Sequence, residues 1–190
     1  MKNQYYRTFI AAPLRMGEPF LQARNNLMEA LREERISWTI PEQYHVTLRF
    51  IGETEQTDMK RIGHALQNDF PVPGQISLDT NGLDSFGPRK KPRVIWVGFE
   101  ESSFIDLLKL EVDRMLELCG IPIENQPFRA HLTLGRVRSL QDLQLYYQII
   151  QEMKHDFKAT VLFDRLVYFR SILGSGGPQY HVLEEVKFPQ

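Results

Sequence analysis

The sequence contains a single cysteine, Cys119, so the chain cannot close an intramolecular disulfide. It also lacks paired Cys and His residues at the spacings that bind zinc. The fold must therefore be stabilised by the burial of apolar side chains rather than by covalent or metal cross-links. A chain of this kind suits a reducing cytoplasm, where we expect the protein to work.

An excess of charge of one sign and long hydrophobic runs are equally absent. Lys and Arg number 23 and Asp and Glu number 24, which gives a net charge of −1. No overall positive field attracts nucleic acid or an anionic membrane, so any site for a polyanion must be a local patch. The apolar run FIAAPL near the N-terminus is broken by Pro13 and followed by Arg15, which makes it too short for a signal sequence or a membrane span.

The composition itself is that of an ordinary globular protein. Hydrophobic residues make up 42% and charged residues 25% of 190 residues, which excludes a disordered or collagenous chain. This length fits one large domain or two small lobes that share a core. We expect a single domain over residues 1–190 and no membrane partner.

Hydrophobic periodicity predicts the order strand, helix, strand, helix, strand, strand, and this order occurs twice. The expected strands lie near residues 6–12, 45–52, 76–83, 94–99, 131–137, 158–172 and 180–188, and the expected helices near 18–35, 57–70, 103–120 and 139–153. The second copy begins after the loop at residues 87–93. The sequence therefore predicts two similar lobes related by a pseudo-twofold axis, with the repeat boundary in this loop.

The repeat has a consistent spacing as well as a consistent order. Phe9 precedes His45 by 36 residues, and Trp96 precedes His131 by 35. Each of these histidines also follows a proline by four residues. Pseudo-twofold packing of the two lobes would bring these distant histidines into one site.

Both histidines begin an H-x-T-L motif, HVTL at residues 45–48 and HLTL at residues 131–134. Side chains two residues apart share one face of a strand, so His45 faces the same way as Thr47. In the second motif His131 and Thr133 do the same, and in both strands the intervening apolar residues face the other way.

One such motif is typical of a solvent-exposed strand, but two at equivalent places in a repeat predict a shared site. Histidine titrates near neutral pH and can act as acid or base. The threonine hydroxyls and Arg136 would neutralise an anionic group held between the strands.

The motifs and their surroundings resemble the two-histidine (2H) phosphoesterases, and within them the bacterial, LigT-like RNA 2′,3′-cyclic phosphodiesterases, also called 2′-5′ RNA ligases. PEQYHVTLRFIGE at residues 41–53 is similar to the first motif of the family, and PFRAHLTLGRVR at residues 127–138 to the second. RTFIAAPL, RVIWVGFE and the C-terminal segment also resemble family segments, so the similarity covers most of the chain. Ala130 stands where family members often have proline.

The resemblance implies an α+β fold with two antiparallel sheets around a central cleft and the helices outside. It also implies hydrolysis of an RNA-terminal 2′,3′-cyclic phosphate to a 2′-phosphate without a metal or other cofactor. In this scheme His45 is the proton donor and His131 the proton acceptor, while Thr47, Thr133 and Arg136 bind the phosphate. The expected partner is RNA with a cyclic phosphate end, and we expect a monomer.

Further residues have two interpretations. Arg89, Lys90, Lys91 and Arg93 form a basic loop that contacts RNA phosphates or is simply solvated. Tyr180 follows a glycine-rich turn and is a weaker candidate for lining the cleft. Arg136 lies five residues after His131, so in an unbroken strand it would face away from the motif, and a role in the cleft requires a bulge or a strand end.

Two alternatives to hydrolysis remain at this stage. The same acid and base groups would catalyse 2′-5′ ligation in the reverse direction. A module that binds a nucleotide or an RNA end without catalysis is the other alternative, although binding alone does not need two titrating imidazoles.

Overall fold

The computed structural model describes residues 4–124, 126–174 and 177–190. Within these ranges the chain forms four α-helices and nine strands. The strands are β1 (Tyr5–Pro13), β2 (Arg35–Trp38), β3 (His45–Glu55), β4 (Ile76–Phe86), β5 (Val94–Phe99), β6 (His131–Ser139), β7 (Thr160–Phe163), β8 (Arg165–Gly174) and β9 (Gly177–Lys187). The helices are α1 (Glu18–Ala30), α2 (Gln56–Asn68), α3 (Ser103–Leu118) and α4 (Leu143–Glu152), with a 3₁₀ turn η1 (Pro41–Gln43).

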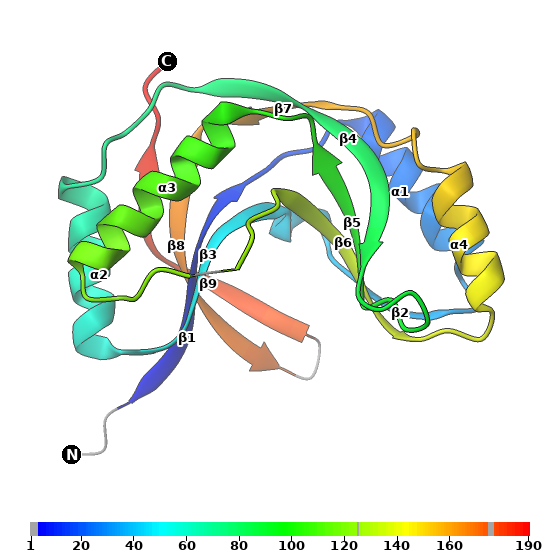
Figure 1. Cartoon of the computed structure of the whole chain (residues 1–190), viewed down its shortest axis with the longest axis horizontal. Coiled ribbons are helices and arrows are strands. Elements are labelled where there is room, and N and C mark those ends of the chain that lie inside the picture. The colour runs from blue at the N-terminus through cyan, green and yellow to red at the C-terminus, as the bar shows by residue number, and fades with distance from the viewer. Residues whose placement is uncertain (1–3, 125, 175–176) are drawn as a thin grey trace.

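The strands form a curled, entirely antiparallel sheet in the order β7-β4-β5-β6-β3-β1-β8-β9, and β2 pairs with β6 (Figure 1). The sheet consists of two halves with the same internal order, β3-β1-β8-β9 and β6-β5-β4-β7. One residue pair, Val46 with Leu132, joins the halves. Both residues are the second of their H-x-T-L motif, so the pseudo-twofold axis passes through this pair. The predicted α+β, bilobal fold is confirmed, with the two expected sheets joined edge to edge.

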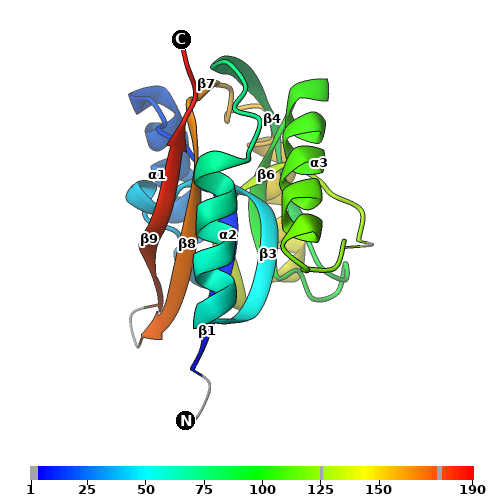
Figure 2. The ribbon, with the colours of Figure 1, turned by 90° about the vertical axis from the view of Figure 1, so that its left-hand side faces the viewer.

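The helices cover the outer face of the sheet in two groups (Figure 1, Figure 2). Helices α2 and α3 pack outside the half that contains β3, and α1 and α4 outside the half that contains β6. The apolar members of the motifs, Val46, Leu48, Leu132 and Leu134, are buried under them. Their burial fixes the register of both strands, because a shift by one residue would expose this row. The histidines are thereby directed to the inner face.

A buried ion pair attaches α3 to β3. Arg49 Nη1 lies 3.1 Å from Asp113 Oδ1, and Lys109 also contacts this carboxylate. Arg49 further donates a hydrogen bond to the carbonyl of Pro122. The side chains of Arg49, Lys109 and Asp113 are each at most 13% exposed. Removal of one partner would leave a buried charge without its counterion.

Two sequence-based boundaries were wrong. The helix expected to reach Arg35 ends at Ala30, and Arg35–Trp38 forms β2 instead. This strand fits against β6 because Gly135 has no side chain, and a Cβ there would come within 2.9 Å of Ile36 Cγ2. Pairing with the sheet thus overrides the helical propensity of the charged segment after Ala30.

The strand expected over residues 158–172 is two strands, β7 and β8, separated by Asp164. Strand β7 pairs with β4, whereas β8 pairs with β1 in the other half of the sheet. The glycine-rich turn expected between the last strands includes residues 175–176, which lie outside the described part of the chain. No helix in the described ranges is long and apolar enough to cross a membrane.

Candidate active site

The centre of the sheet brings the two motifs together. Strands β3 and β6 are antiparallel, and their pairing at Val46 and Leu132 sets residue 45 opposite 133 and residue 47 opposite 131. Each histidine therefore faces the threonine of the other motif across the junction of β3 and β6, which we call the seam. His45, Thr47, His131 and Thr133 are all half-buried on the inner face.

The two imidazoles are held by the same hydrogen bond. Nδ1 of His45 lies 2.7 Å from the carbonyl oxygen of Gln43, and Nδ1 of His131 lies 2.8 Å from that of Arg129. A carbonyl oxygen can only accept, so Nδ1 carries the hydrogen in both rings. Each Nε2 is left to accept a proton when the ring is neutral and to donate one when it is charged.

A pair of stacked aromatic rings supports each histidine. On one side Phe9 lies 5.3 Å from the His45 ring and stacks on Phe169 at 5.1 Å. On the other side Phe86 lies 4.9 Å from the His131 ring and stacks on Trp96 at 4.6 Å. Both imidazoles are therefore oriented by packing as well as by a hydrogen bond.

The surroundings lower the pKa of both histidines below the ordinary value. For His45 burial has the largest effect; the hydrogen bond to Gln43 raises the pKa, and the charges of His131 and Arg136 lower it further. For His131 burial again dominates, the bond to Arg129 opposes it, and the cations Arg136 and Arg129 lower the pKa. Each ring can thus be neutral at neutral pH, as a general base must be.

Arg136 faces the histidines because β6 contains a bulge. Opposite β5 the register shifts between Ile95 and Trp96, whose partners are Gly135 and Thr133, so Leu134 is the extra residue. The extra residue reverses the alternation and turns Arg136 to the face of His131 and Thr133. The arrangement that the sequence argument required is therefore present. The positive charge of Arg136 acts on the pKa of both histidines and of Tyr180.

Tyr180 also lies at this site, on the side of His45. Its ring centroid is 5.4 Å from that of His45 and 5.0 Å from that of Phe9. Burial raises the pKa of its hydroxyl, and the charge of Arg136 lowers it. Tyr180 therefore remains a neutral hydrogen-bonding group at neutral pH.

The basic loop lies next to the end of β6 that carries Arg136. Its four cationic side chains are exposed, and the carbonyl of Arg93 accepts a hydrogen bond of 2.9 Å from Val137 N. Within the described part of the chain, none of these four side chains is among the groups that contact the two histidines. The loop thus extends the positive charge away from the seam rather than adding to it.

Several groups at the site were missed by the sequence argument. The carbonyls of Gln43 and Arg129 leave no signature in a sequence, because every residue has one. Phe9 and Trp96 served only as markers of the repeat, although their equivalent spacing to the two histidines was the signal. The guanidinium of Arg129, which lies 4.4 Å above the Trp96 ring, gave no signal.

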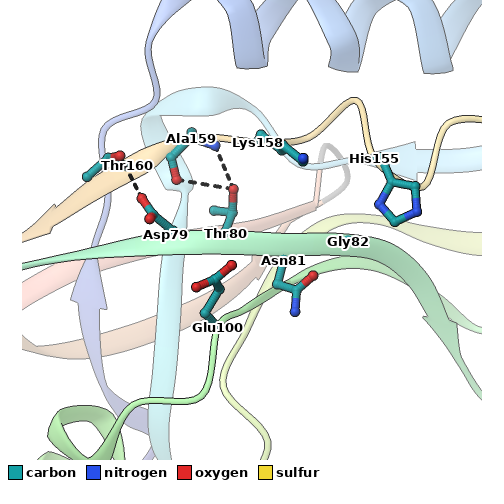
Figure 3. Close-up of a pocket in the computed structure, with 9 residues that line it drawn as sticks. All are labelled: Asp79, Thr80, Asn81, Gly82, Glu100, His155, Lys158, Ala159 and Thr160. Carbon is teal, nitrogen blue, oxygen red and sulfur yellow. Dashed lines mark hydrogen bonds between the residues drawn. The ribbon is translucent and has the colours of Figure 1, made fainter.

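A polar pocket of about 550 Å³ lies outside both motifs, between β4 and β7 (Figure 3). Its polar groups hold these strands together. Asp79 accepts a hydrogen bond of 2.6 Å from Thr160, and the hydroxyl of Thr80 is bonded to the backbone of Ala159 (Figure 3). The described part of the chain contains no group of three His, Cys, Asp or Glu residues placed to hold a metal ion.

Comparisons with known proteins find one family and several relatives along most of the chain. The family described as "LigT like Phosphoesterase" matches residues 12–96 and 103–180, one segment in each half of the chain. A protein of Aeropyrum pernix named RNA 2′,3′-cyclic phosphodiesterase is 32% identical over 77% of this chain and 82% of its own length. A protein of the same name from Thermotoga maritima is 29% identical over 96% of this chain and 95% of its own.

Solved structures share the fold. E. coli LigT in complex with 3′-AMP is 17% identical, with a TM-score of 0.68 over 98% of this chain and 100% of that one. A protein of Thermus thermophilus gives a TM-score of 0.67 at 24% identity, over 96% and 97% of the two chains. With the family match covering both halves of the sequence, the chain belongs to the LigT-like phosphoesterase family.

Proposed function

We propose that this protein is an RNA 2′,3′-cyclic phosphodiesterase that opens the cyclic phosphate at an RNA end to a 2′-phosphate. The observation that carries the proposal is the matched pair of imidazoles on the inner face, each with Nδ1 bonded to a carbonyl, which leaves Nε2 available for proton transfer. Relatives over most of the chain length are named for this activity. Two such bases on opposite sides of one phosphorus suit in-line displacement.

The proposed reaction moves two protons. His131 Nε2 accepts a proton from water as the water oxygen forms its bond to phosphorus. The bond from phosphorus to the 3′-oxygen breaks, and His45 Nε2 donates a proton to this oxygen. The products are a 2′-phosphate and a 3′-hydroxyl. At the end of the reaction His131 is protonated and His45 is neutral.

The assignment of acid and base rests on the family resemblance. Burial is the largest cause that lowers the pKa of both histidines, and nearby cations lower both further. The resemblance makes His45 the proton donor and His131 the proton acceptor.

Charge on the phosphoryl oxygens is neutralised by this chain's own residues in the proposal. Thr47 and Thr133 donate hydrogen bonds to the non-bridging oxygens, and Arg136 supplies a positive charge. No metal or cofactor is needed for these steps. The RNA strand leading to the cyclic end would follow Arg89, Lys90, Lys91 and Arg93, with Tyr180 beside the terminal nucleotide.

The test is a product assay with a dinucleotide that ends in a 2′,3′-cyclic phosphate, followed by ³¹P NMR. We expect conversion to the 2′-phosphate by the wild-type protein and no conversion by a variant with both histidines replaced by alanine. A 3′-phosphate product would overturn the proposed direction of ring opening. Intact substrate with measurable binding would identify a binding module instead of an enzyme.

A further inference from the structure

Gln43 connects two parts of the site that are distant in sequence. Its carbonyl oxygen accepts the hydrogen bond of 2.7 Å from Nδ1 of His45. Its side-chain Nε2 donates a hydrogen bond of 3.2 Å to the carbonyl of Pro178, which is 135 residues further along the chain and is the second residue of β9. One residue therefore contacts both the imidazole and the end of the β8–β9 hairpin.

The backbone next to Gln43 is fixed by the core. Tyr44 is buried, and its carbonyl accepts a hydrogen bond of 2.8 Å from Leu14 N. The backbone of Tyr44 is extended, so the side chains of its neighbours Gln43 and His45 lie on the opposite side from this buried ring. The side chain of Gln43 therefore reaches the hairpin from a fixed position.

The end of the hairpin matters because it carries Tyr180. This residue follows Pro178 by two positions on β9, and its ring meets the ring of His45 edge-on at 5.4 Å between centroids. Strand β9 is at the edge of the sheet order, next to β8. An edge strand has its ladder of hydrogen bonds on one side, so an additional bond to the turn before β3 restricts its movement.

The equivalent residue in the second half, Arg129, places its side chain differently. It also accepts from Nδ1 of its histidine, but its guanidinium lies 4.4 Å from the ring of Trp96 on the neighbouring strand β5. His45 has Tyr180 against it in addition to its stacked pair of rings, whereas the described residues show only the stacked pair of rings against His131. The contact from Gln43 to the hairpin thus belongs to the half with the additional ring.

We propose that Gln43 is a positioning residue whose side-chain amide holds Tyr180 against His45 and keeps water from that side of the imidazole. The inference rests on the proposed function, in which His45 donates a proton to the leaving oxygen. Without the amide contact His45 would keep its hydrogen bond to the carbonyl but lose the packing of Tyr180. The imidazole would then be less firmly oriented toward the reacting atoms, which slows proton transfer.

The kinetic test is Gln43→Met, which keeps the length of the side chain and the backbone carbonyl but removes the amide donor. Gln75→Met is the matched control, because Gln75 Nε2 donates a similar bond of 3.1 Å to the carbonyl of Phe188, just beyond the opposite end of β9. Gln43→Met should lower kcat for a 2′,3′-cyclic phosphate about 10- to 100-fold, and Gln75→Met should leave it unchanged. Equal kcat values in the two variants would overturn the proposal.

A double-mutant cycle tests whether Gln43 acts through Tyr180. Tyr180→Ala should lower kcat by itself, and the addition of Gln43→Met should cause little further loss, because the ring that the amide holds in place is then absent. Losses in kcat that multiply would show that the two residues act independently, and they would overturn the route through Tyr180.

NMR titration of the histidine side chains tests the same contact without turnover. His131 and Arg136, the charged neighbours of His45, are kept in Gln43→Met. Water that reaches the imidazole favours its charged form, so the pKa of His45 should rise in this variant by more than that of His131. An unchanged pKa of His45, or an equal rise in the control variant, would overturn the positioning role. If the pKa of His45 rises as expected but the wild-type protein does not open the cyclic phosphate, the proposed function is refuted and the contact is still supported.

Discussion

The carbonyls of Gln43 and Arg129 determine which nitrogen of each imidazole carries the hydrogen. A histidine on a strand has two nitrogens, and without a partner either can carry the hydrogen. Here the residue two positions earlier accepts from Nδ1 in both motifs. The backbone before each strand thus selects the tautomer, and the side-chain pattern selects the face. Both conditions are needed for two imidazoles to act as a pair.

The pH dependence of the free enzyme should reflect the lowered pKa values. The base must be neutral, so the rate rises as pH increases through its pKa; the acid must be protonated, so the rate falls above its pKa. Burial lowers both pKa values below the ordinary 6.5, so both limbs of the kcat/KM profile should lie below pH 6.5. Arg136→Gln should move both limbs to higher pH. A wild-type profile with both limbs above 6.5 would contradict this description of the site.

The threonine hydroxyls should matter for rate rather than for stability. Thr47→Val and Thr133→Val keep the shape of the side chain and remove the hydrogen-bond donor. We expect each to lower kcat on the order of 10- to 1000-fold, with little change in the urea midpoint of unfolding. Thr57→Val, at an exposed position on α2, serves as the control. Wild-type kinetics in both active-site variants would remove the threonines from the mechanism.

Strand β6 contains three features at neighbouring residues. These are the H-x-T-L motif, the bulge at Leu134 and the close approach of β2 at Gly135. A Cβ at Gly135 would come within 3.0 Å of Trp38 Cε3 and 2.9 Å of Ile36 Cγ2. The bulge and β2 therefore fix where Arg136 is placed, because β2 pairs with Gly135 and Arg136 directly.

Gly135→Ala should accordingly destabilise the protein and disturb the site. The added methyl group must displace β2, at a cost of about 1–3 kcal/mol in the free energy of unfolding. Because Arg136 follows directly, KM for the cyclic phosphate should also rise. Urea denaturation and steady-state kinetics measure the two effects. Gly74→Ala, where a Cβ would meet its nearest atom at an ordinary 4.0 Å, is the control, and equal stability of the two variants would count against this packing argument.

Periodicity predicted most strands and helices because their apolar residues face one core. It failed where pairing partners decide the conformation. Arg35–Trp38 is a strand only because Gly135 leaves space for it, and Asp164 separates two strands that pair in different halves of the sheet. The orientation of Arg136 could be predicted only on the condition that β6 contains a bulge. A bulge depends on the neighbouring strand rather than on the residues within β6.

The repeat allowed the central residues of the site to be predicted from sequence. Equivalent positions in two halves must meet at the axis, and Val46 and Leu132 pair there. Residues away from the axis could not be predicted in this way, because the halves differ: Phe50 corresponds to Arg136, and Arg49 corresponds to Gly135. The symmetry supplies two similar histidines, and these differences make the surroundings of the two histidines unequal.

A site built from hydroxyls, imidazoles and an arginine should work without a divalent ion. We expect turnover of a 2′,3′-cyclic phosphate substrate to be unchanged in millimolar EDTA and unaffected by added Mg²⁺ or Mn²⁺, because Arg136 and the two threonines neutralise the phosphoryl charge. Steady-state rates before and after dialysis against EDTA measure this. Activity that is lost on dialysis and restored by one of these ions would show that a metal ion, rather than the arginine and threonines, neutralises the phosphoryl charge.

The measurement that tests the division of labour between the histidines most directly uses a substrate in which sulfur replaces the leaving 3′-oxygen. A thiolate leaves without a proton, so the substrate bypasses the acid but still needs the base. With the ordinary substrate, His45→Ala and His131→Ala should each lower the rate roughly 100- to 10,000-fold. With the sulfur substrate His45→Ala should recover most of the wild-type rate and His131→Ala should not. Recovery in His131→Ala alone would reverse the two roles, and full activity of either variant on the ordinary substrate would contradict catalysis by two histidines.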